Sequence, residues 1–468
     1  MPLILWFRRD FRLSDNPMLA RAVATGRPLV PVFILDDDMR TLAAAPKFRL
    51  GLGLAAFAAR LEAVGSRLIL RRGPALEVLR GLVAETGATA VHWGRLYDPS
   101  ARARDAAIKA GLRAAGLETE SHPGHLLHEP WTVATAEGGA YRVYSPFWRA
   151  VRDRDPAIAA GAGVTLRTPQ IWPVSETLSA WTLDRDMRRG ASVVARYQNV
   201  GEVAALARLD RFLEGGIAGY RALRDFPAVA GTSRLSENLT WGEIGVRTIW
   251  HAAKRAMEDG AAGAETYLRE VIWREFAWHL MYHTPHIAVR NWREEWDGFA
   301  WRGDNAEAER WRQGMTGEPF VDAAMREMFV TGSMHNRARM IVASYLTKHL
   351  LTDWRVGQRW FEECLTDWDP ASNAMGWQWV AGSGPDAAPY FRVFNPATQA
   401  AKFDADGTYV RRHVAELAGG APGREALDFF EAVPRAWGLD PSRGYPAPLV
   451  GLAEGRARAL GAFAARGA

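Results

Sequence analysis

The segment Tyr267–His279 offers three kinds of reactive side chain on one surface. Residues three and four positions apart are neighbours on a helix, and here these are Glu270, Trp273, Arg274 and Ala277. A carboxylate, an indole and a guanidinium therefore share one face. The alternative is structural, an ion pair between Glu270 and Arg274 beside a tryptophan of the core.

Two later segments also place polar and aromatic groups at close spacing. Asn336 and Met340 are one helical turn apart, with arginines including Arg337 on either side, although a solvated basic helix would have the same pattern. Farther on, we expect a short loop dense in Asp, Asn, Pro and Gly that presents Trp377 and Trp379. Indoles displayed over a concave surface suit a flat aromatic ligand or an unstacked base.

The stretch Tyr220–Ser236 gathers hydroxyl groups, an arginine and backbone N–H groups in a turn that contains glycine. Such a turn can hold a phosphate. Turns rich in Ser and Thr are also common where a helix is capped, so the motif alone leaves both interpretations open.

Several catalytic classes lack their signature in this sequence. No metal site is expected, because Pro and Gly interrupt one histidine cluster and the other has no glutamate partner; the clusters are His122, His125 and His128, and His283 and His286. No GxSxG motif predicts a hydrolytic serine, and neither GxGxxG nor GxxxxGK[ST] follows the first expected strand. The single cysteine, Cys364, excludes an internal disulfide and agrees with a reducing cytosol.

The composition is that of a globular protein of two or three domains, with 468 residues, 48% hydrophobic and 24% charged. No apolar stretch approaches the roughly 18–20 residues that span a bilayer, and charged residues follow the apolar N-terminal run before a signal-peptide core could form. We therefore expect a cytoplasmic protein without a membrane segment. The net charge of +5 permits a polyanionic partner, and 13 of the 20 tryptophans cluster between Trp241 and Trp379.

The first 130 residues alternate apolar runs with amphipathic stretches, the pattern of a parallel sheet wrapped by helices. The expected strands are Leu3–Phe7, Leu29–Leu35, Arg67–Arg71, Ala90–Trp93 and Glu118–His122. Helices should begin near Pro17, Lys47, Pro74 and Arg102 and end near Gly65, Gly87 and Gly116. Residues 1–130 are thus predicted to form a doubly wound, Rossmann-like α/β domain.

The rest of the chain changes character twice. Residues 131–195 are rich in Pro, Gly, Thr and isolated Trp, which predicts a long interdomain linker over the surface. Residues 196–468 show helical patterns as far as about Leu417 and no strand pattern, so a mainly α-helical second domain is expected. Thr240–Glu243 has the capping-box pattern of a helix start, and Pro319 suits a first helical turn.

Together these segments resemble the DNA photolyase and cryptochrome family, and they are most similar to a bacterial class I cyclobutane pyrimidine dimer photolyase. The likeness covers nearly the whole chain and is carried, in order, by Trp6–Asn16, Trp93–Pro99, Thr232–Ser236, Trp273–Phe276, His335–Met340, Trp377–Trp379, Asp386–Asn395 and Lys402–Asp404. It implies an α/β antenna domain, a linker and a helical catalytic domain that holds FAD in a U shape. It also allows a second chromophore, methenyltetrahydrofolate or 8-hydroxy-deazaflavin, without deciding between them.

The resemblance carries the family's FAD contacts over to Tyr220, Thr232, Ser233, Arg234, Leu235, Ser236, Tyr267, Arg274, Asn336, Asp367, Asp369 and Asn373. The hydroxyl and N–H groups would bind the pyrophosphate, while Asp369 would face the flavin ring and Asn373 its N5. Similar relatives often carry tryptophan at position 267, and the tyrosine found here can still pack against FAD.

The partner implied by the resemblance is UV-damaged DNA containing pyrimidine dimers, bound by a monomer. A flipped-out dimer would lie among Glu270, Trp273, Asn336, Met340 and Trp379, with phosphates on Arg224, Arg337, Arg392 and Lys402. A dimer is already poorly stacked, so it costs less to extrude than a normal pair. Electron transfer from excited reduced FAD would split the cyclobutane ring, and the electron would then return. Glu270, if protonated or hydrogen-bonded at a pyrimidine carbonyl, would stabilise the radical anion where charge develops.

The family's electron relay carries over to Trp377, Trp354 and Trp301, whose separation in sequence means that only the fold could bring them together. Two other activities of the family are disfavoured. A (6-4) photolyase would place histidines where Asn336 and Met340 stand. A cryptochrome-type blue-light photoreceptor would tend to carry aspartate at position 373 and a long polar C-terminal tail.

Overall fold

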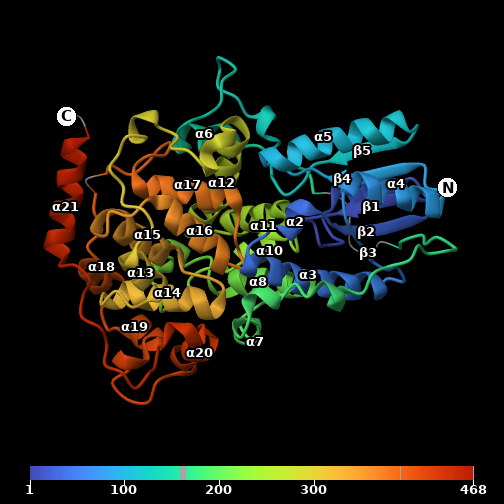
Figure 1. The fold of residues 1–468 in the computed structure, drawn as a ribbon. Coiled ribbons are helices and arrows are strands. Elements are labelled where there is room, and N and C mark those ends of the chain that lie inside the picture. Colours follow the sequence, from blue (N-terminus) through green and yellow to red (C-terminus); the bar gives the residue numbers. More distant parts are fainter. Residues whose placement is uncertain (159–164, 391, 467–468) are drawn as a thin grey trace.

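The computed structural model describes residues 1–158, 165–390 and 392–466. An α/β unit lies at the N-terminal end of an elongated molecule and a helical unit occupies the rest (Figure 1). Residues 159–164 of the expected linker lie outside the described residues. Among the helices that are described, none has both the length and the apolar character needed to cross a bilayer.

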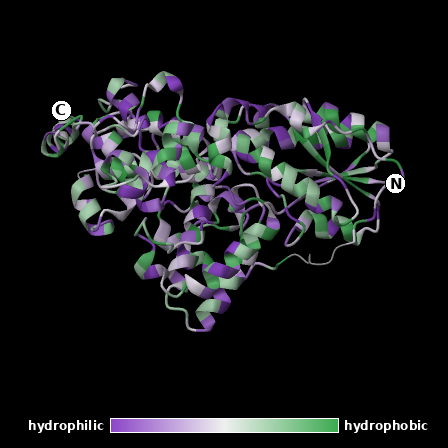
Figure 2. Ribbon diagram, turned by 90° about the horizontal axis from the view of Figure 1, so that it is seen from below, coloured by the Kyte–Doolittle hydropathy of each residue, from purple (hydrophilic) through white to green (hydrophobic). Residues whose placement is uncertain are grey.

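The predicted parallel sheet is confirmed. Its five strands lie in the order β3-β2-β1-β4-β5 and pair in parallel; they are β1 (Leu3–Phe7), β2 (Leu29–Leu35), β3 (Ile69–Arg72), β4 (Ala90–Gly94) and β5 (Glu118–His122). Strands β1, β2 and β4 are buried along their whole length and appear as apolar ribbons between the helices (Figure 2). Helices on both faces explain why these strands are continuously apolar rather than alternating.

The helices of this unit are α1 (Pro17–Ala24), α2 (Asp37–Arg40), α3 (Ala44–Glu62), α4 (Ala75–Thr86) and α5 (Pro99–Ala114). Two of them begin three residues earlier than predicted, α3 at Ala44 and α5 at Pro99. For α5 the reason is the cap, because the Asp98 carboxylate accepts a hydrogen bond from the Ala101 N–H. Gly87 ends α4 in the left-handed conformation, with φ of 65°.

The connector between the two units is only partly a surface segment. It contains α6 (Tyr144–Val151) and α7 (Gly190–Ala195), and α6 buries Tyr144, Phe147, Trp148 and Val151 in the core of the helical unit. Those apolar residues have the i, i+3, i+4, i+7 spacing of an amphipathic helix. The prediction of a connector draped over the surface is therefore wrong for α6.

The helical unit is confirmed and extends beyond Leu417. Its helices are α8 (Glu202–Gly215), α9 (Tyr220–Leu223), α10 (Ser236–Thr240), α11 (Val246–Glu258), α12 (Ala264–His283), α13 (Ala306–Arg312), α14 (Pro319–Thr331), α15 (Asn336–Ser344), α16 (Trp354–Cys364), α17 (Pro370–Ala381), α18 (Pro396–Phe403), α19 (Thr408–His413), α20 (Arg424–Ala432) and α21 (Leu452–Ala465). Pro319 is in the first turn of α14, as predicted.

The capping box predicted at Thr240–Glu243 is wrong. Thr240 ends α10 and its hydroxyl donates to the carbonyl of Asp367, while α11 begins only at Val246. The fully buried Glu243 instead accepts hydrogen bonds from Arg49 of α3 at 2.6 and 2.9 Å. The tertiary ion pair competes with the local cap, and it joins the helical unit to the α/β unit.

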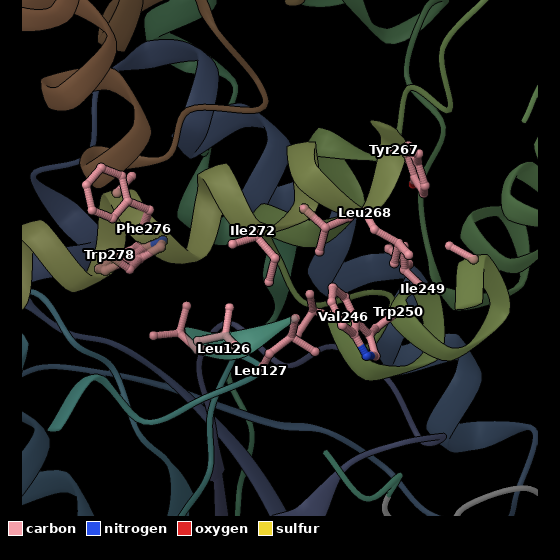
Figure 3. Packing of buried hydrophobic residues seen from close by; sticks show 14 of the residues in the cluster. Leu126, Leu127, Val246, Ile249, Trp250, Tyr267, Leu268, Ile272, Phe276 and Trp278 are labelled. Atoms are coloured by element: carbon pink, nitrogen blue, oxygen red, sulfur yellow. The ribbon is translucent and has the colours of Figure 1, made fainter. Parts of the chain in front are cut away.

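Helix α12 runs through the core of the helical unit. One side of it packs against α11 and the segment that follows β5, as Figure 3 shows for residues including Leu126, Leu127, Val246, Ile249, Trp250, Leu268 and Ile272. This packing fixes the rotation of α12 about its axis. Its remaining side, which carries Glu270, Trp273 and Arg274, is thereby turned toward a large cavity.

Candidate functional site

A cavity of about 640 Å³ lies within the helical unit, within the size range of small-molecule and cofactor sites. It collects most of the predicted site residues from distant parts of the chain: Tyr220, Arg224, Thr232, Ser233, Arg234, Leu235, Ser236, Tyr267, Glu270, Trp273, Arg274, Asn336, Met340, Asp367, Asp369, Asn373, Trp377 and Trp379. Of the predicted set, Arg337, Arg392, Lys402, Trp354 and Trp301 do not line it.

The segment Asp367–Trp379 is not the predicted loop. Pro370 begins helix α17, and the Asp369 carboxylate caps it by accepting a hydrogen bond of 2.8 Å from the Ser372 N–H. Asp before Pro is a helix start as well as a turn, which explains the error. As a consequence, Asn373 and Trp377 are one turn apart on the same helix and both line the cavity.

Two buried aspartates lie at the start of α17. The second oxygen of Asp369 accepts a hydrogen bond of 2.9 Å from the Trp278 indole, and Arg274 Nε lies 3.9 Å away. Asp367 accepts one of 2.7 Å from Arg339, and its other oxygen has no partner among the described residues. Asp367 is thus held in place, with one buried oxygen unpaired among the described residues.

Glu270 does not pair with Arg274. Its carboxylate accepts a hydrogen bond from Arg224, the C-cap residue of α9, while Arg274 donates to the carbonyl of His125 at 2.8 Å. The purely structural i,i+4 pair considered from the sequence is therefore wrong. The carboxylate of Glu270 is oriented by an arginine 46 positions away, at the wall of the cavity.

The indole of Trp273 is stacked on the ring of Tyr144 from α6. The ring centroids are 3.7 Å apart and the planes differ by 6°. The Tyr144 hydroxyl donates to the carbonyl of Arg269 at 2.6 Å, which fixes the tyrosine against α12. Trp273 is therefore held rigidly at the cavity. Sequence reasoning missed Tyr144, although the apolar spacing of α6 could have revealed its contact with the core.

The loop before α10 contributes the hydroxyl groups of the site. Thr232, Ser233 and Ser236 line the cavity, and Ser233 Oγ accepts a hydrogen bond of 3.1 Å from Tyr267. Arg234 has φ of 51°, a left-handed conformation that costs free energy in a non-glycine residue and is frequent at ligand sites. Hydroxyl groups on a strained turn fit the binding of a pyrophosphate.

The cavity also contains buried polar atoms that have no hydrogen-bond partner among the described residues. They are Asp367 Oδ1, His335 Nε2, Trp368 Nε1 and Trp377 Nε1. Such atoms are costly unless a partner satisfies them. Together with the hydroxyl loop and the aromatic walls, they fit a large polar cofactor with an aromatic ring system, as FAD has.

Several residues that line the cavity are not among the predicted site residues. Arg208, Arg339 and His335 line the cavity from α8, α15 and the cap of α15. Burial lowers the pKa of His335 to about 4, so this side chain is neutral at pH 7. The arginines that follow Asn336 in the sequence indicated a charged helix. Their spacing alone could not show that Arg339, and not Arg337, lines the cavity.

The three tryptophans predicted to form an electron relay lie on segments that contact one another. Trp377 packs against Gly357 of α16, where a Cβ atom would lie only 2.0 Å from the indole. Trp354 is one turn away on α16, is buried and donates to Asn291 at 2.9 Å. Trp301 precedes Arg302, whose carbonyl accepts from the Asp353 N–H at 2.9 Å. The fold therefore brings the three segments together.

The remaining predicted DNA contacts lie outside the cavity. Arg337 pairs with Asp225 at 2.8 Å and covers the ring of Phe403. Arg392 and Lys402 are exposed, and no ion pair to either is found among the described residues. These two cations are therefore available to an anionic partner.

Comparisons with known proteins agree with this arrangement. Residues 3–162 match the family model of DNA photolyase, and residues 267–465 match that of the FAD binding domain of DNA photolyase. The chain is 46% identical over 475 residues to the deoxyribodipyrimidine photo-lyase of Agrobacterium fabrum, which covers 99% of this chain and 98% of the relative. With the Escherichia coli protein of the same name the identity is 35%, over 99% of this chain and 98% of that protein.

Solved structures show the same fold over the full chain. A bacterial class III photolyase from Agrobacterium tumefaciens has a TM-score of 0.91 at 45% identity, covering 100% of this chain and 98% of that chain; its class differs from the class I likeness suggested by the sequence. An archaeal photolyase from Sulfolobus tokodaii with two FAD molecules has a TM-score of 0.79 at 28% identity, covering 99% and 100%. A Synechocystis cryptochrome has 0.83 at 26% identity, covering 98% and 99%.

Family matches in both units and full-length identity of this level lead to one conclusion. This chain belongs to the DNA photolyase family and carries the family's FAD-binding domain in its helical unit.

Proposed function

We propose that this chain repairs cyclobutane pyrimidine dimers in DNA in a light-dependent reaction, acting as a monomer with its catalytic centre in residues 196–468. The observation that carries the proposal is the cavity itself. It combines the cofactor-binding hydroxyl loop, the aspartates of α17 and a wall formed by Glu270, Trp273, Asn336, Met340 and Trp379.

The residues proposed to hold FAD divide by chemistry. Thr232, Ser233 and Ser236 offer hydroxyl groups to the pyrophosphate, and Asp369, oriented by Trp278, faces the ring system. Asn373 lies on the same helix one turn from Asp369 and its amide donates to the Gln358 carbonyl at 3.1 Å, which leaves its oxygen for the cofactor. When bound in reduced form, FAD supplies the electron that light transfers.

The lesion is proposed to stack on the indoles. Trp273 is preorganised by Tyr144, so little conformational entropy remains to be lost when a base of the dimer stacks on it. Each base stacked on an aromatic side chain contributes roughly 1–3 kcal/mol. This gain offsets the cost of extruding the dimer, which is smaller than for normal bases because the dimer is poorly stacked.

Glu270 and Arg224 are proposed to act on the pyrimidine carbonyls. Arg224 fixes the carboxylate at the cavity wall, and its own charge lies beside the place where negative charge would develop on the dimer. The fixed positive charge of Arg224 can stabilise this negative charge without reorganising during the reaction. The exposed Arg392 and Lys402, with Arg337 and Arg224, are proposed to contact phosphates of the damaged strand.

A second cavity of about 220 Å³ is proposed to take the antenna chromophore. Its wall combines aromatic rings with cations, namely Trp93, Tyr97, Trp131 and Tyr282 with Arg95, Arg102 and Lys109. This chemistry suits a flat, anionic molecule, a description that fits both a folate and a deazaflavin. A chromophore bound there is proposed to absorb light and transfer the energy to the flavin in the helical unit.

The test is repair of defined lesions by the purified protein. Absorption should first show bound flavin and any second chromophore. After chemical reduction, blue light should restore a cyclobutane thymine dimer in an oligonucleotide, while the dark control and a (6-4) oligonucleotide should stay unrepaired. Bound flavin without repair of the cyclobutane dimer would contradict the proposal and favour a photoreceptor, and repair of the (6-4) lesion alone would favour that class.

A further inference from the structure

Three side chains with metal-ligating atoms meet on the α/β unit, remote from the flavin cavity. In the pairing of β4 with β5, His92 is opposite Glu120, and Gly94 is opposite His122. Residues two apart in a strand point to the same face, as do residues that are paired across two strands. His92, Glu120 and His122 therefore share one face of the sheet at its β5 edge.

Their ligand atoms are already close together. His122 Nε2 lies 3.3 Å from His92 Nδ1, Glu120 Oε2 lies 3.7 Å from His92 Nε2, and Glu120 Oε1 lies 3.9 Å from His122 Nδ1. One ligand atom from each residue lies within 4.8 Å of the other two. The 3.3 Å contact is a hydrogen bond between the two rings, and Glu120 faces the other nitrogen of each ring. One zinc ion takes one nitrogen from each ring and holds its ligand atoms about 3.3 Å apart, so the side chains must rotate and move closer to close the site.

Burial prepares the two imidazoles for metal binding. Both histidines are buried, and burial lowers the pKa of His92 and lowers that of His122 to about 4. At neutral pH both rings are thus neutral and offer lone pairs. His92 Nε2 is buried and has no hydrogen-bond partner among the described residues, a cost that a bound cation would remove.

We propose that His92, His122 and Glu120 bind one divalent transition-metal ion of the zinc type. Two imidazoles and one carboxylate are a ligand set that zinc accepts, with a water molecule completing the tetrahedron. The ion would tie the edge strand β5 to β4. Local spacing could not indicate this site, because 28 positions separate His92 from Glu120 and the parallel pairing alone brings them together.

The surroundings allow the ion to enter. The Glu120 side chain is 38% exposed, and its contact with Arg21 is a 3.5 Å pair between exposed groups, which contributes little and can be exchanged for the metal. The neighbouring Arg27 is engaged by Glu118 at 3.3 Å. Glu118 lies on the same strand and face but outside the cluster, so it provides a matched control.

The experiment is a calorimetric titration of the flavin-containing, full-length protein with Zn²⁺ alone, after chelator treatment and dialysis. We expect one equivalent to bind and the midpoint of thermal unfolding to rise with Zn²⁺. Since loss of second-shell partners alone weakens metal sites by about 10–100-fold, Glu120→Gln, His122→Gln and His92→Gln should each weaken binding at least about 100-fold. Glu118→Gln and His286→Gln should bind like the parent. A Co²⁺ titration should give the visible bands of a tetrahedral site in the parent and none in the variants.

Two results would overturn the proposal. One is a parent protein that binds no stoichiometric Zn²⁺. The other is parent-like affinity in Glu120→Gln and His122→Gln, which would place the ion elsewhere. The buried His92→Gln variant could fail to fold, which loss of bound flavin or of the circular dichroism signal would reveal. In that case the half-exposed Glu120→Gln variant decides whether the cluster binds the ion, because it removes a ligand without opening the core.

Discussion

Arg224, the C-cap residue of α9, and Glu270 on α12 form an ion pair at the wall of the cavity in the helical unit, although 46 positions separate them in the chain. The pair holds the Glu270 carboxylate toward the space where the lesion is proposed to lie. It also ties α9 to α12. Both the orientation of the carboxylate and the local rigidity of the site therefore depend on Arg224.

Replacing Glu270 by Ala should lower the number of dimers repaired per photon severalfold while leaving flavin content nearly intact, because the carboxylate is proposed to act on the lesion. The measurement is repair under calibrated blue light with chemically reduced flavin. Glu265→Gln is the control, since Glu265 lies on the same helix and pairs with Arg269 at 3.2 Å but does not line the cavity. Parent-like repair by the Glu270 variant would leave this residue only a structural partner of Arg224.

Replacing Trp273 by Ala should weaken binding to dimer-containing DNA by roughly 1–3 kcal/mol, the stacking contribution of one base. Affinity for undamaged DNA should change much less, because only an extruded lesion reaches this indole. Binding is measured on matched oligonucleotides with and without a dimer. Tyr144→Phe keeps the stacked ring and should bind like the parent, whereas equal losses on both DNAs for the Trp273 variant would refute the flipped-lesion geometry.

Replacing Trp301 by Phe should suppress photoreduction of oxidised flavin by an external donor but spare repair by flavin that is reduced chemically beforehand. Phenylalanine keeps most of the apolar bulk against Phe299 and Tyr390, so a large loss of stability is not expected. Flash absorption and dimer repair are measured on one preparation. Unchanged photoreduction would remove Trp301 from the relay, and lost repair would indicate structural damage.

Replacing Glu275 by Gln should reduce the pH dependence of stability. Burial raises the pKa of Glu275 from 4.5 to about 7, against the opposing effects of Arg274 and of N–H groups from His128 and Leu127. A raised acid pKa means that stability is fully present below pH 4.5 and declines as pH rises to about 7, by at most about 3 kcal/mol.

Urea unfolding from pH 4.5 to 8 measures this effect. The glutamine variant should show a smaller decline than the parent over that window. Burial and the nearby Asp322 also raise the pKa of Glu318 to about 7. Glu318 therefore contributes a separate part of the decline in stability, and Glu318→Gln should reduce the pH dependence further, in addition to the effect of Glu275→Gln. Parallel curves for the parent and the Glu275 variant would show that this carboxyl does not titrate as stated.

The sequence by itself determined the architecture of the two units. Parallel strands covered on both faces must be apolar, so the runs Leu3–Phe7 and Leu29–Leu35 were found at their observed bounds. The end of α4 at Gly87 and the start of α14 at Pro319 depend on the backbone preferences of single residues. These preferences can be predicted directly from the sequence. The chemistry of the cofactor site followed from ordered motifs, through the resemblance they carry.

Only the tertiary structure decided how the side chains of the site are paired. Spacing within one helix suggested Arg274 as the partner of Glu270, but packing of α9 against α12 supplies Arg224 instead. The composition of Asp367–Trp379 suits a loop and a capped helix equally. The structure shows a helix, whose first turn is capped by the hydrogen bond from the Ser372 N–H to the Asp369 carboxylate.

The same limit applies to the stack of Tyr144 on Trp273 and to the cluster of His92 with His122. The physical reason is range. Caps, turns and periodicity act over about four residues and are readable in the sequence, whereas contacts between distant segments depend on how whole elements pack.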